Sequence, residues 1–313
     1  MPHTSSYDAP GNARGGYVGR FAPSPSGPLH RGSLVAALAS LLDARAHGGL
    51  WRLRIEDTDT PRMMPGGATR ILRTLERFGF QWDGEVVLQS RRGAAYEHAW
   101  AQLAAQGRVY RCTCTRREIA DSGAPGVDGA PVYPGTCRTH PPDGQRPAAW
   151  RLRVDDSVIE FDDRQAGRQV QALAGEVGDF IVKRADGIWA YQLAAVVDDA
   201  EAGITDVVRG ADLLASTARQ IFLQTLLDLP TPRYLHVPLV TLASGEKLSK
   251  QTGAAALDDE DVLESLEAAA AHLGLSVEPV DAIEEFWAKA IPAWRGRYMN
   301  ERENPSVSEL ERR

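Results

Sequence analysis

Histidine, glycine and serine stand close together in the segment RFAPSPSGPLHRGS, residues 20–33. Prolines stiffen the loop before His30, and an alanine- and leucine-rich run follows Ser33. The amides at a helix N-terminus favour a phosphate group, and a glycine lets a nucleotide approach the backbone. A histidine there can donate to phosphate oxygens as negative charge develops. The segment therefore predicts a nucleotide site at His30, Gly32 and Ser33, with an ordinary loop-to-helix junction as the alternative.

A second candidate segment is SGEKLSKQTG, residues 244–253, which follows the last strong predicted strand. Lys247 and Lys250 stand three residues apart on this glycine-bounded loop. Lysine acts as a mobile point charge, so the pair could clamp a polyphosphate. The alternative is a solvated basic loop.

The elements that must position these side chains alternate between strands and helices. The expected helices cover residues 33–47, 67–78, 94–106, 192–201 and 212–229 and the stretch from 256. The expected strands cover residues 16–22, 51–57, 85–90, 108–112, 148–154, 157–161, 204–210 and 233–242, with a hairpin at 179–191. This alternation favours an α/β fold with a parallel, doubly wound sheet.

Charged and polar residues end three of these strands. The segments are Arg20–Ser24, Glu56–Asp57 and Arg209–Gly210. In a doubly wound sheet, ligands bind outside the carboxyl ends of the strands. We therefore expect these residues to lie around one binding site.

Composition sets outer limits on the class of protein. The chain has 313 residues, 43% of them hydrophobic, which suffices for one large domain or one plus a smaller module. It lacks a run of about 18 apolar residues, and its first 16 residues lack the apolar segment of a signal peptide. We expect a cytoplasmic protein that does not span a membrane. The net charge of −7 argues against a general nucleic-acid binder, although a local basic stripe would suffice for RNA.

All three cysteines lie between positions 112 and 137. An odd, clustered set is better suited to a metal site than to a disulfide framework. The surrounding residues 112–147 are rich in glycine, proline and threonine and interrupt the strand–helix pattern. They are expected to form an insertion.

The quoted segments together resemble a known family. A P-x-x-x-x-H-x-G-S pattern near the N-terminus and K-L-S-K far downstream resemble the paired HIGH and KMSKS signatures of class I aminoacyl-tRNA synthetases. The stretches RIEDTD, YQLAAVVDD and VVRGADL resemble the glutamyl subgroup. The resemblance covers residues 16–253 and implies a Rossmann-like class I catalytic core with a C-terminal helical extension.

The resemblance also implies the substrates and their contacts. ATP, with Mg²⁺, and L-glutamate would form glutamyl-adenylate and pyrophosphate. The catalytic and ATP-binding residues would be His30, Gly32, Ser33, Lys247 and Lys250. The glutamate-binding residues would be Arg20, Ala22, Ser24, Glu56, Tyr191 and Arg209. Without the family, Glu56 would be interpreted as a salt bridge to Arg54 or Arg62, and Arg209 as a surface ion pair.

The cysteine cluster matches a zinc pattern of the same subgroup. Its ligands would be Cys112, Cys114, Tyr133 and Cys137, holding a structural Zn²⁺. The 18 residues between Cys114 and Tyr133 exceed the usual spacing. His140 therefore remains a rival for the fourth position, and a loop with three free cysteines remains the alternative.

Length separates two paralogues of the subgroup. Only 62 residues follow Gln251, so we expect no room for a helical anticodon-binding domain. The short paralogue transfers glutamate to the queuosine base at the wobble position of tRNA(Asp), and we expect a monomer. The alternatives are a truncated glutamyl-tRNA synthetase that charges a 3′ end, and a non-catalytic zinc-stabilised RNA-binding protein. We expect a tail at 1–16, a catalytic domain split into 17–111 and 148–253 by a zinc-binding insertion at 112–147, and an extension at 254–313.

Overall fold

The computed structural model describes residues 16–144, 146–241, 256–257 and 261–299. A parallel three-stranded sheet contains β1 (Val18–Phe21), β2 (Leu50–Ile55) and β3 (Val87–Leu88). Helix α1 (Arg31–Ala46) links β1 to β2, and α2 (Gly67–Arg77) follows a 3-10 turn at Thr60–Arg62. Every residue of β1 is buried, as expected for a strand covered on both faces.

A second sheet has the strand order β7-β6-β10-β9. Its strands are β6 (Val158–Asp163), β7 (Gly167–Ala172), β9 (Asp206–Gly210) and β10 (Arg233–Val237). Strand β10 pairs in parallel with both β6 and β9, and α7 (Tyr191–Glu201) and α8 (Leu214–Leu226) flank β9 in the sequence. The amide of Thr205 donates to the carbonyl of Val18 at 2.9 Å, which joins this sheet to β1. The predicted α/β class with a parallel sheet is confirmed.

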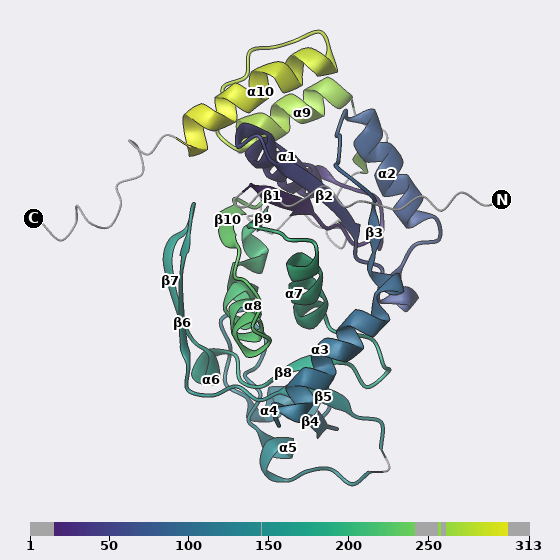
Figure 1. Cartoon of the computed structure of the whole chain (residues 1–313), viewed down its shortest axis with the longest axis vertical. Helices are drawn as coiled ribbons and strands as arrows, with labels where there is room; N and C mark the ends of the chain where they lie inside the picture. The colour runs from purple at the N-terminus through teal and green to yellow at the C-terminus, as the bar shows by residue number, and fades with distance from the viewer. Residues whose placement is uncertain (1–15, 145, 242–255, 258–260, 300–313) are drawn as a thin grey trace, which may run out of the picture.

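The third sheet differs from the prediction, because its strands pair antiparallel and form a separate unit. It contains β4 (Val109–Cys112), β5 (Ala149–Leu152) and β8 (Phe180–Lys183), with β5 between the other two. Helix α3 (Gly93–Ala105) precedes it, and the short helices α4 (Arg116–Ser122), α5 (Thr136–Thr139) and α6 (Leu173–Glu176) surround it. Figure 1 shows this unit at the end of the molecule opposite the C-terminal helices.

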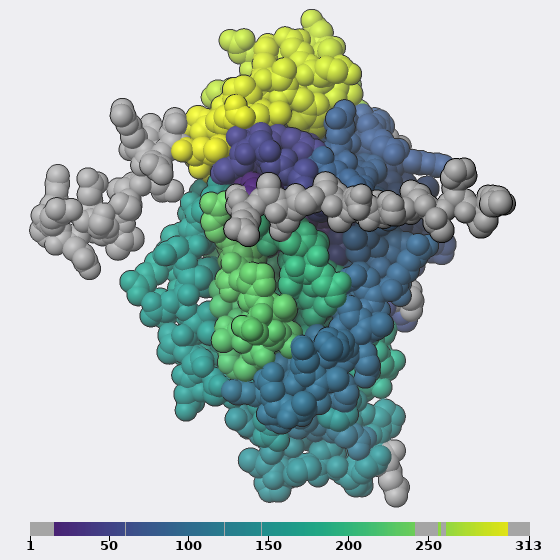
Figure 2. Space-filling view, viewed as in Figure 1, coloured from purple at the N-terminus to yellow at the C-terminus, as the bar shows by residue number. Residues whose placement is uncertain are grey.

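The C-terminal part of the described chain forms α9 (Val262–His272) and α10 (Ile283–Tyr298), so the predicted helical extension is confirmed there. Both helices pack against α1 (Figure 1) and cap that end of the molecule in the space-filling view (Figure 2). Leu266, Phe286 and Trp294 are fully buried in the same hydrophobic cluster as Leu38 of α1. No helix in the described ranges is long and apolar enough to cross a membrane.

Candidate active site

A cavity of about 480 Å³ opens at the carboxyl ends of β1, β2, β9 and β10. All the sequence-predicted ATP and glutamate residues within the described chain line it: Arg20, Ala22, Ser24, His30, Gly32, Ser33, Glu56, Tyr191 and Arg209. The lysines Lys247 and Lys250 lie outside the described residues. Residues separated by nearly 190 positions thus share one cavity because parallel strands end at one edge.

Helix α1 begins at Arg31, with the side chain of His30 as its N-cap. The amide of Ser33 donates to His30 Nδ1 at 3.3 Å, so a histidine takes the capping role expected of a serine. With Nδ1 accepting, the proton of the neutral ring lies on Nε2, where it can serve as a donor. Gly32 and Ser33 line the cavity beside it. The geometry suits phosphate oxygens at the start of α1.

Arg20 belongs to a buried network of ion pairs beside the cavity. Its Nε atom lies 3.3 Å from Asp199 Oδ1, and Arg54 Nη1 lies 2.6 Å from the same oxygen. Burial alone would raise the pKa of Asp199, but the Arg20 and Arg54 guanidinium groups hold it below its usual value. Asp199 therefore stays ionised and fixes one side of the Arg20 guanidinium.

Glu56 lies at the cavity, as the family resemblance implies, and also forms one of the salt bridges considered from the sequence. Its side chain lines the cavity and also accepts from Arg54 Nη2 at 3.2 Å, while Arg62 pairs with Asp59 instead. Burial raises the pKa of Glu56 against the opposing effect of Arg54. An ammonium group in the cavity would favour its ionised form.

Arg209 is buried, with 4% of its surface exposed, which excludes the surface ion pair considered from the sequence. It donates to His236 Nε2 at 3.0 Å and to Thr217 Oγ1 at 2.9 Å. It also donates to the Tyr191 hydroxyl at 3.3 Å and to the Leu213 carbonyl at 3.4 Å. All these hydrogen-bond acceptors are neutral, and the Arg209 guanidinium carbon lies 5.5 Å from the centre of the Tyr234 ring. Among the described residues, Arg209 therefore has no carboxylate paired with it.

The residues that support the two arginines were not predicted from the sequence. Asp198 and Asp199 lie on the buried face of α7, and Asp163 and His236 lie on β6 and β10. A signal existed for the first pair, because two adjacent carboxylates inside the apolar run LAAVVDDA require buried partners.

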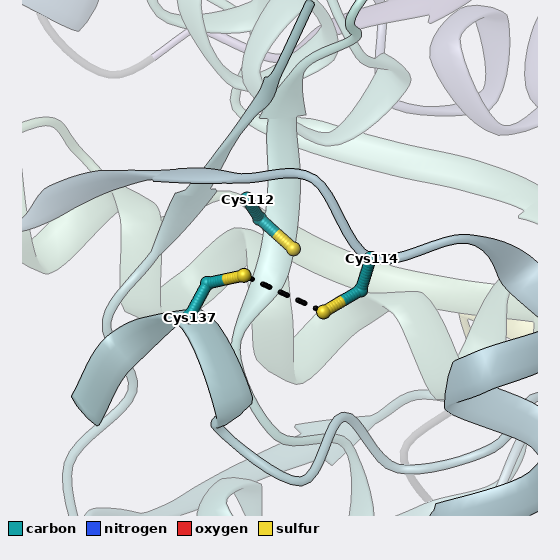
Figure 3. A group of neighbouring side chains, drawn as sticks. All are labelled: Cys112, Cys114 and Cys137. Carbon is teal, nitrogen blue, oxygen red and sulfur yellow. Dashed lines mark hydrogen bonds between the residues drawn. The ribbon is translucent and has the colours of Figure 1, made fainter. Parts of the chain in front are cut away.

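The three cysteines converge between β4 and α5, and Figure 3 shows their sulfur atoms facing one another. The three Sγ atoms lie within 4.8 Å of one another, with Cys114 and Cys137 at 3.4 Å. The Tyr133 hydroxyl lies 3.4 Å from Cys112 Sγ and 3.6 Å from Cys114 Sγ. His140 is exposed, and its Nδ1 atom lies 2.9 Å from Thr139 Oγ1. The Tyr133 hydroxyl thus lies beside two of the three sulfurs.

Arg151 lies against the cluster from β5. Its Nε–H donates to Cys112 Sγ at 3.2 Å, and its guanidinium carbon lies 3.9 Å from the centre of the Tyr133 ring. A fixed positive charge suits a site that gathers several anionic ligands. The long segment between Cys114 and Tyr133 contacts another part of the chain, because its Asp128 forms an ion pair with Arg219 of α8.

The model of the family described as tRNA synthetases class I (E and Q), catalytic domain, matches residues 17–286. The chain is 61% identical over 293 residues to a protein of Burkholderia cenocepacia strain J2315 named glutamyl-Q tRNA(Asp) synthetase, covering 90% of this chain and 97% of that protein. A protein of the same name from Verminephrobacter eiseniae is 58% identical over 289 residues, covering 90% and 98%.

A solved structure described as glutamate–tRNA synthetase from Elizabethkingia anophelis superposes with a TM-score of 0.72 at 25% identity. The match covers 88% of this chain but only 65% of that protein. The residues that match the family model include all the strands around the cavity, from β1 to β10. The chain belongs to the class I tRNA synthetases of the glutamate and glutamine group.

Proposed function

We propose that the chain is an ATP-dependent ligase that activates L-glutamate and transfers the glutamyl group to the queuosine base of tRNA(Asp). The observation that carries the proposal is the identity of 58–61% over nearly the whole length of relatives named glutamyl-Q tRNA(Asp) synthetase. The cavity supports it, because the buried arginines Arg20 and Arg209 and the carboxylate of Glu56 match the charges of free glutamate.

In the proposed mechanism, the α-carboxylate of glutamate attacks the α-phosphorus of ATP, and pyrophosphate leaves. Arg20 and Arg209 bind the carboxylates, Glu56 holds the ammonium group, and Tyr191 contributes a hydroxyl. Ala22 and Ser24 line the same pocket. His30, Gly32 and Ser33 bind ATP, and Lys247 and Lys250 offset charge on the phosphates. When bound, Mg²⁺ adds to that charge compensation. Positioning and electrostatics carry this reaction, so it requires no covalent nucleophile.

Labelled glutamate distinguishes the proposed acceptor from a 3′ end. With ATP and Mg²⁺, we expect label on tRNA that contains queuosine and none on matched tRNA that lacks it. Removing the 3′-terminal adenosine from the first tRNA should leave the labelling unchanged, because that cut spares the anticodon.

Each alternative predicts a different outcome. Equal labelling of both tRNAs, abolished by the 3′ cut, would establish ordinary aminoacylation. A lack of glutamate-dependent ATP–pyrophosphate exchange, with tRNA present, would support a non-catalytic RNA-binding protein.

We also propose that residues 112–147 form a zinc-binding insertion with Cys112, Cys114, Tyr133 and Cys137 as ligands. Three sulfurs and one oxygen can close a tetrahedral structural site. The buried hydroxyl beside two sulfurs supports Tyr133 over His140, and the Arg151 guanidinium supports an anionic ligand set. When bound, the metal would hold the end of β4 and helix α5 together.

Replacing Tyr133 with phenylalanine should weaken zinc retention by at least about tenfold, because it removes one ligand and preserves the ring. His140→Ala is the matched control and should retain the metal. Metal analysis after dialysis against a chelator measures both. Loss of zinc from the His140 variant alone would make the histidine the fourth ligand.

We also propose a location, an oligomeric state and a division into domains. The enzyme acts in the cytoplasm, where its tRNA substrate is found, and as a monomer. Its parts are a tail at 1–16, a catalytic domain at 17–111 and 148–253, the zinc-binding insertion at 112–147 and a helical extension at 254–313. Sedimentation at working concentration tests the monomer.

A further inference from the structure

Three buried side chains from neighbouring strands form a continuous hydrogen-bonded chain behind the cavity. Asp163 on β6 lies 2.6 Å from His236 Nδ1 on β10, and His236 Nε2 accepts from Arg209 Nε on β9 at 3.0 Å. Between 2% and 4% of the surface of each residue is exposed. Only Arg209 lines the cavity, so the other two act through it.

The contacts determine the tautomer of His236. Arginine carries donors only, so the ring nitrogen that faces Arg209 Nε must be an acceptor without a hydrogen. The ring proton therefore lies on Nδ1 and faces Asp163 Oδ2. Burial and the nearby Arg209 lower the pKa of His236, despite the opposing effect of Asp163. The imidazole is neutral in this arrangement.

The same contacts account for most of the donors of Arg209. Its Nε–H goes to His236, and its two Nη2 hydrogens go to Thr217 and Leu213. One Nη1 hydrogen goes to the hydroxyl of Tyr191. Of five N–H groups, one on Nη1 is left without an acceptor among the described residues. The Tyr191 hydroxyl, which accepts from Arg209, keeps its own hydrogen to donate.

We propose that Asp163 and His236 are positioning residues that orient Arg209 for selection of the substrate carboxylate. They fix the guanidinium so that its remaining Nη1–H and the Tyr191 hydroxyl together face one carboxylate in the cavity. Arg209 thus offers one charge-assisted hydrogen bond, which the hydroxyl of Tyr191 supplements. This inference rests on the proposed function, because glutamate supplies the carboxylate.

Asp163→Asn tests the tautomer with little change of shape. Asp163 Oδ1 accepts backbone amides from His236, Gln165 and Ala166 at 3.3, 3.0 and 2.7 Å. The oxygen of an asparagine must stay with these three donors, so its NH₂ group faces His236 Nδ1. The imidazole must then carry its proton on Nε2, which puts an N–H against the Arg209 Nε–H.

The expected result is a selective loss of glutamate binding. In ATP–pyrophosphate exchange, Asp163→Asn should raise KM for glutamate by about 10- to 100-fold and leave KM for ATP unchanged. Asp162→Asn, on the exposed neighbour in the same strand, is the matched control and should behave as wild type. An unchanged KM for glutamate in a folded Asp163→Asn variant overturns the proposal.

His236→Asn provides a second variant in case the first fails to fold. An asparagine can still donate to Asp163 but has no acceptor at the position of Nε2, so KM for glutamate should rise similarly. Adding Asp163→Asn to it should cause no further rise, because no imidazole remains to change tautomer. Multiplying effects would overturn the role assigned to the tautomer.

Nitrogen NMR of the histidine rings separates this inference from the proposed function. The His236 signals, assigned by their loss in His236→Asn, should report the Nδ1–H form in wild type and the Nε2–H form in Asp163→Asn. The same tautomer in both overturns the inference, whatever the activity. Wild-type protein that lacks glutamate-dependent exchange but shows the expected tautomers overturns the proposed function alone.

Discussion

Arg209→Gln is expected to lower kcat/KM for glutamate in ATP–pyrophosphate exchange by roughly 30- to 5,000-fold. Removing one partner of a buried charge pair costs about 2–5 kcal/mol, and each 1.4 kcal/mol corresponds to about tenfold. Because the hydrogen-bond partners of Arg209 in the described protein are neutral, we expect a bound carboxylate to supply the counter-charge that these residues lack. The loss should fall on glutamate and leave KM for ATP near its wild-type value.

Arg20→Gln provides the contrast. Arg20 shares the buried Asp199 with Arg54, so its loss leaves that carboxylate with less compensation even without substrate. We expect this variant to lose stability as well as activity, whereas Arg209→Gln should lose mainly activity. Arg168→Gln, which removes an exposed arginine of β7, should change neither.

Exchange kinetics and chemical denaturation of the three variants test this assignment. If Arg209→Gln raised KM for ATP and left KM for glutamate unchanged, Arg209 would belong to the nucleotide side of the cavity.

The convergence of the site could be predicted because it follows from local signals and one topological rule. Arg20, Glu56 and Arg209 each end or follow a buried strand, and parallel strands end at the same edge of a sheet. That these residues meet could be predicted without their spacing in the sequence or the composition of the chain. The loop and helix start at His30 were recognisable from prolines, glycine and the apolar run that follows.

The supporting residues could not be predicted because their roles depend on strand pairing. Asp163 and His236 are 73 positions apart and meet only because β6 lies beside β10. The antiparallel order of β4, β5 and β8 was missed for the same reason, since an apolar run predicts a strand but not its neighbour. Strand β7 consists mostly of polar, exposed residues, so no alternation of apolar and polar residues indicated it.

A buried carboxylate joins three distant parts of the chain. Asp43 of α1 accepts from the Tyr17 hydroxyl at 2.5 Å and from Trp294 Nε1 of α10 at 2.9 Å. Arg164, in the turn between β6 and β7, donates to both of its oxygens at 2.5 and 2.9 Å. The Asp43 side chain is fully buried. It therefore connects the C-terminal extension to the residue before β1 and to the turn between β6 and β7.

Asp43→Asn should lower the free energy of unfolding by about 3–5 kcal/mol at neutral pH, because it removes the buried carboxylate that pairs with the largely buried guanidinium of Arg164. Glu160→Gln, which breaks the exposed pair with Arg168, is the matched control and should cost less than about 1 kcal/mol. Denaturant unfolding measures both. A loss in the Asp43 variant no larger than in the control would mean that apolar packing alone holds α10 against α1.

The pH dependence of that difference provides a second test. Burial alone would raise the pKa of Asp43, but Arg164 and the hydrogen bonds from Tyr17 and Trp294 hold it below its usual value. A carboxyl with a lowered folded pKa contributes its full stability above its unfolded pKa, about 3.9, and loses it as the pH falls through the folded value. The gap between wild type and Asp43→Asn should therefore be constant from about pH 5 to 8 and narrow below about pH 4. A gap that persisted unchanged into that acidic range would mean that the shape of the side chain, not its charge, connects the three segments.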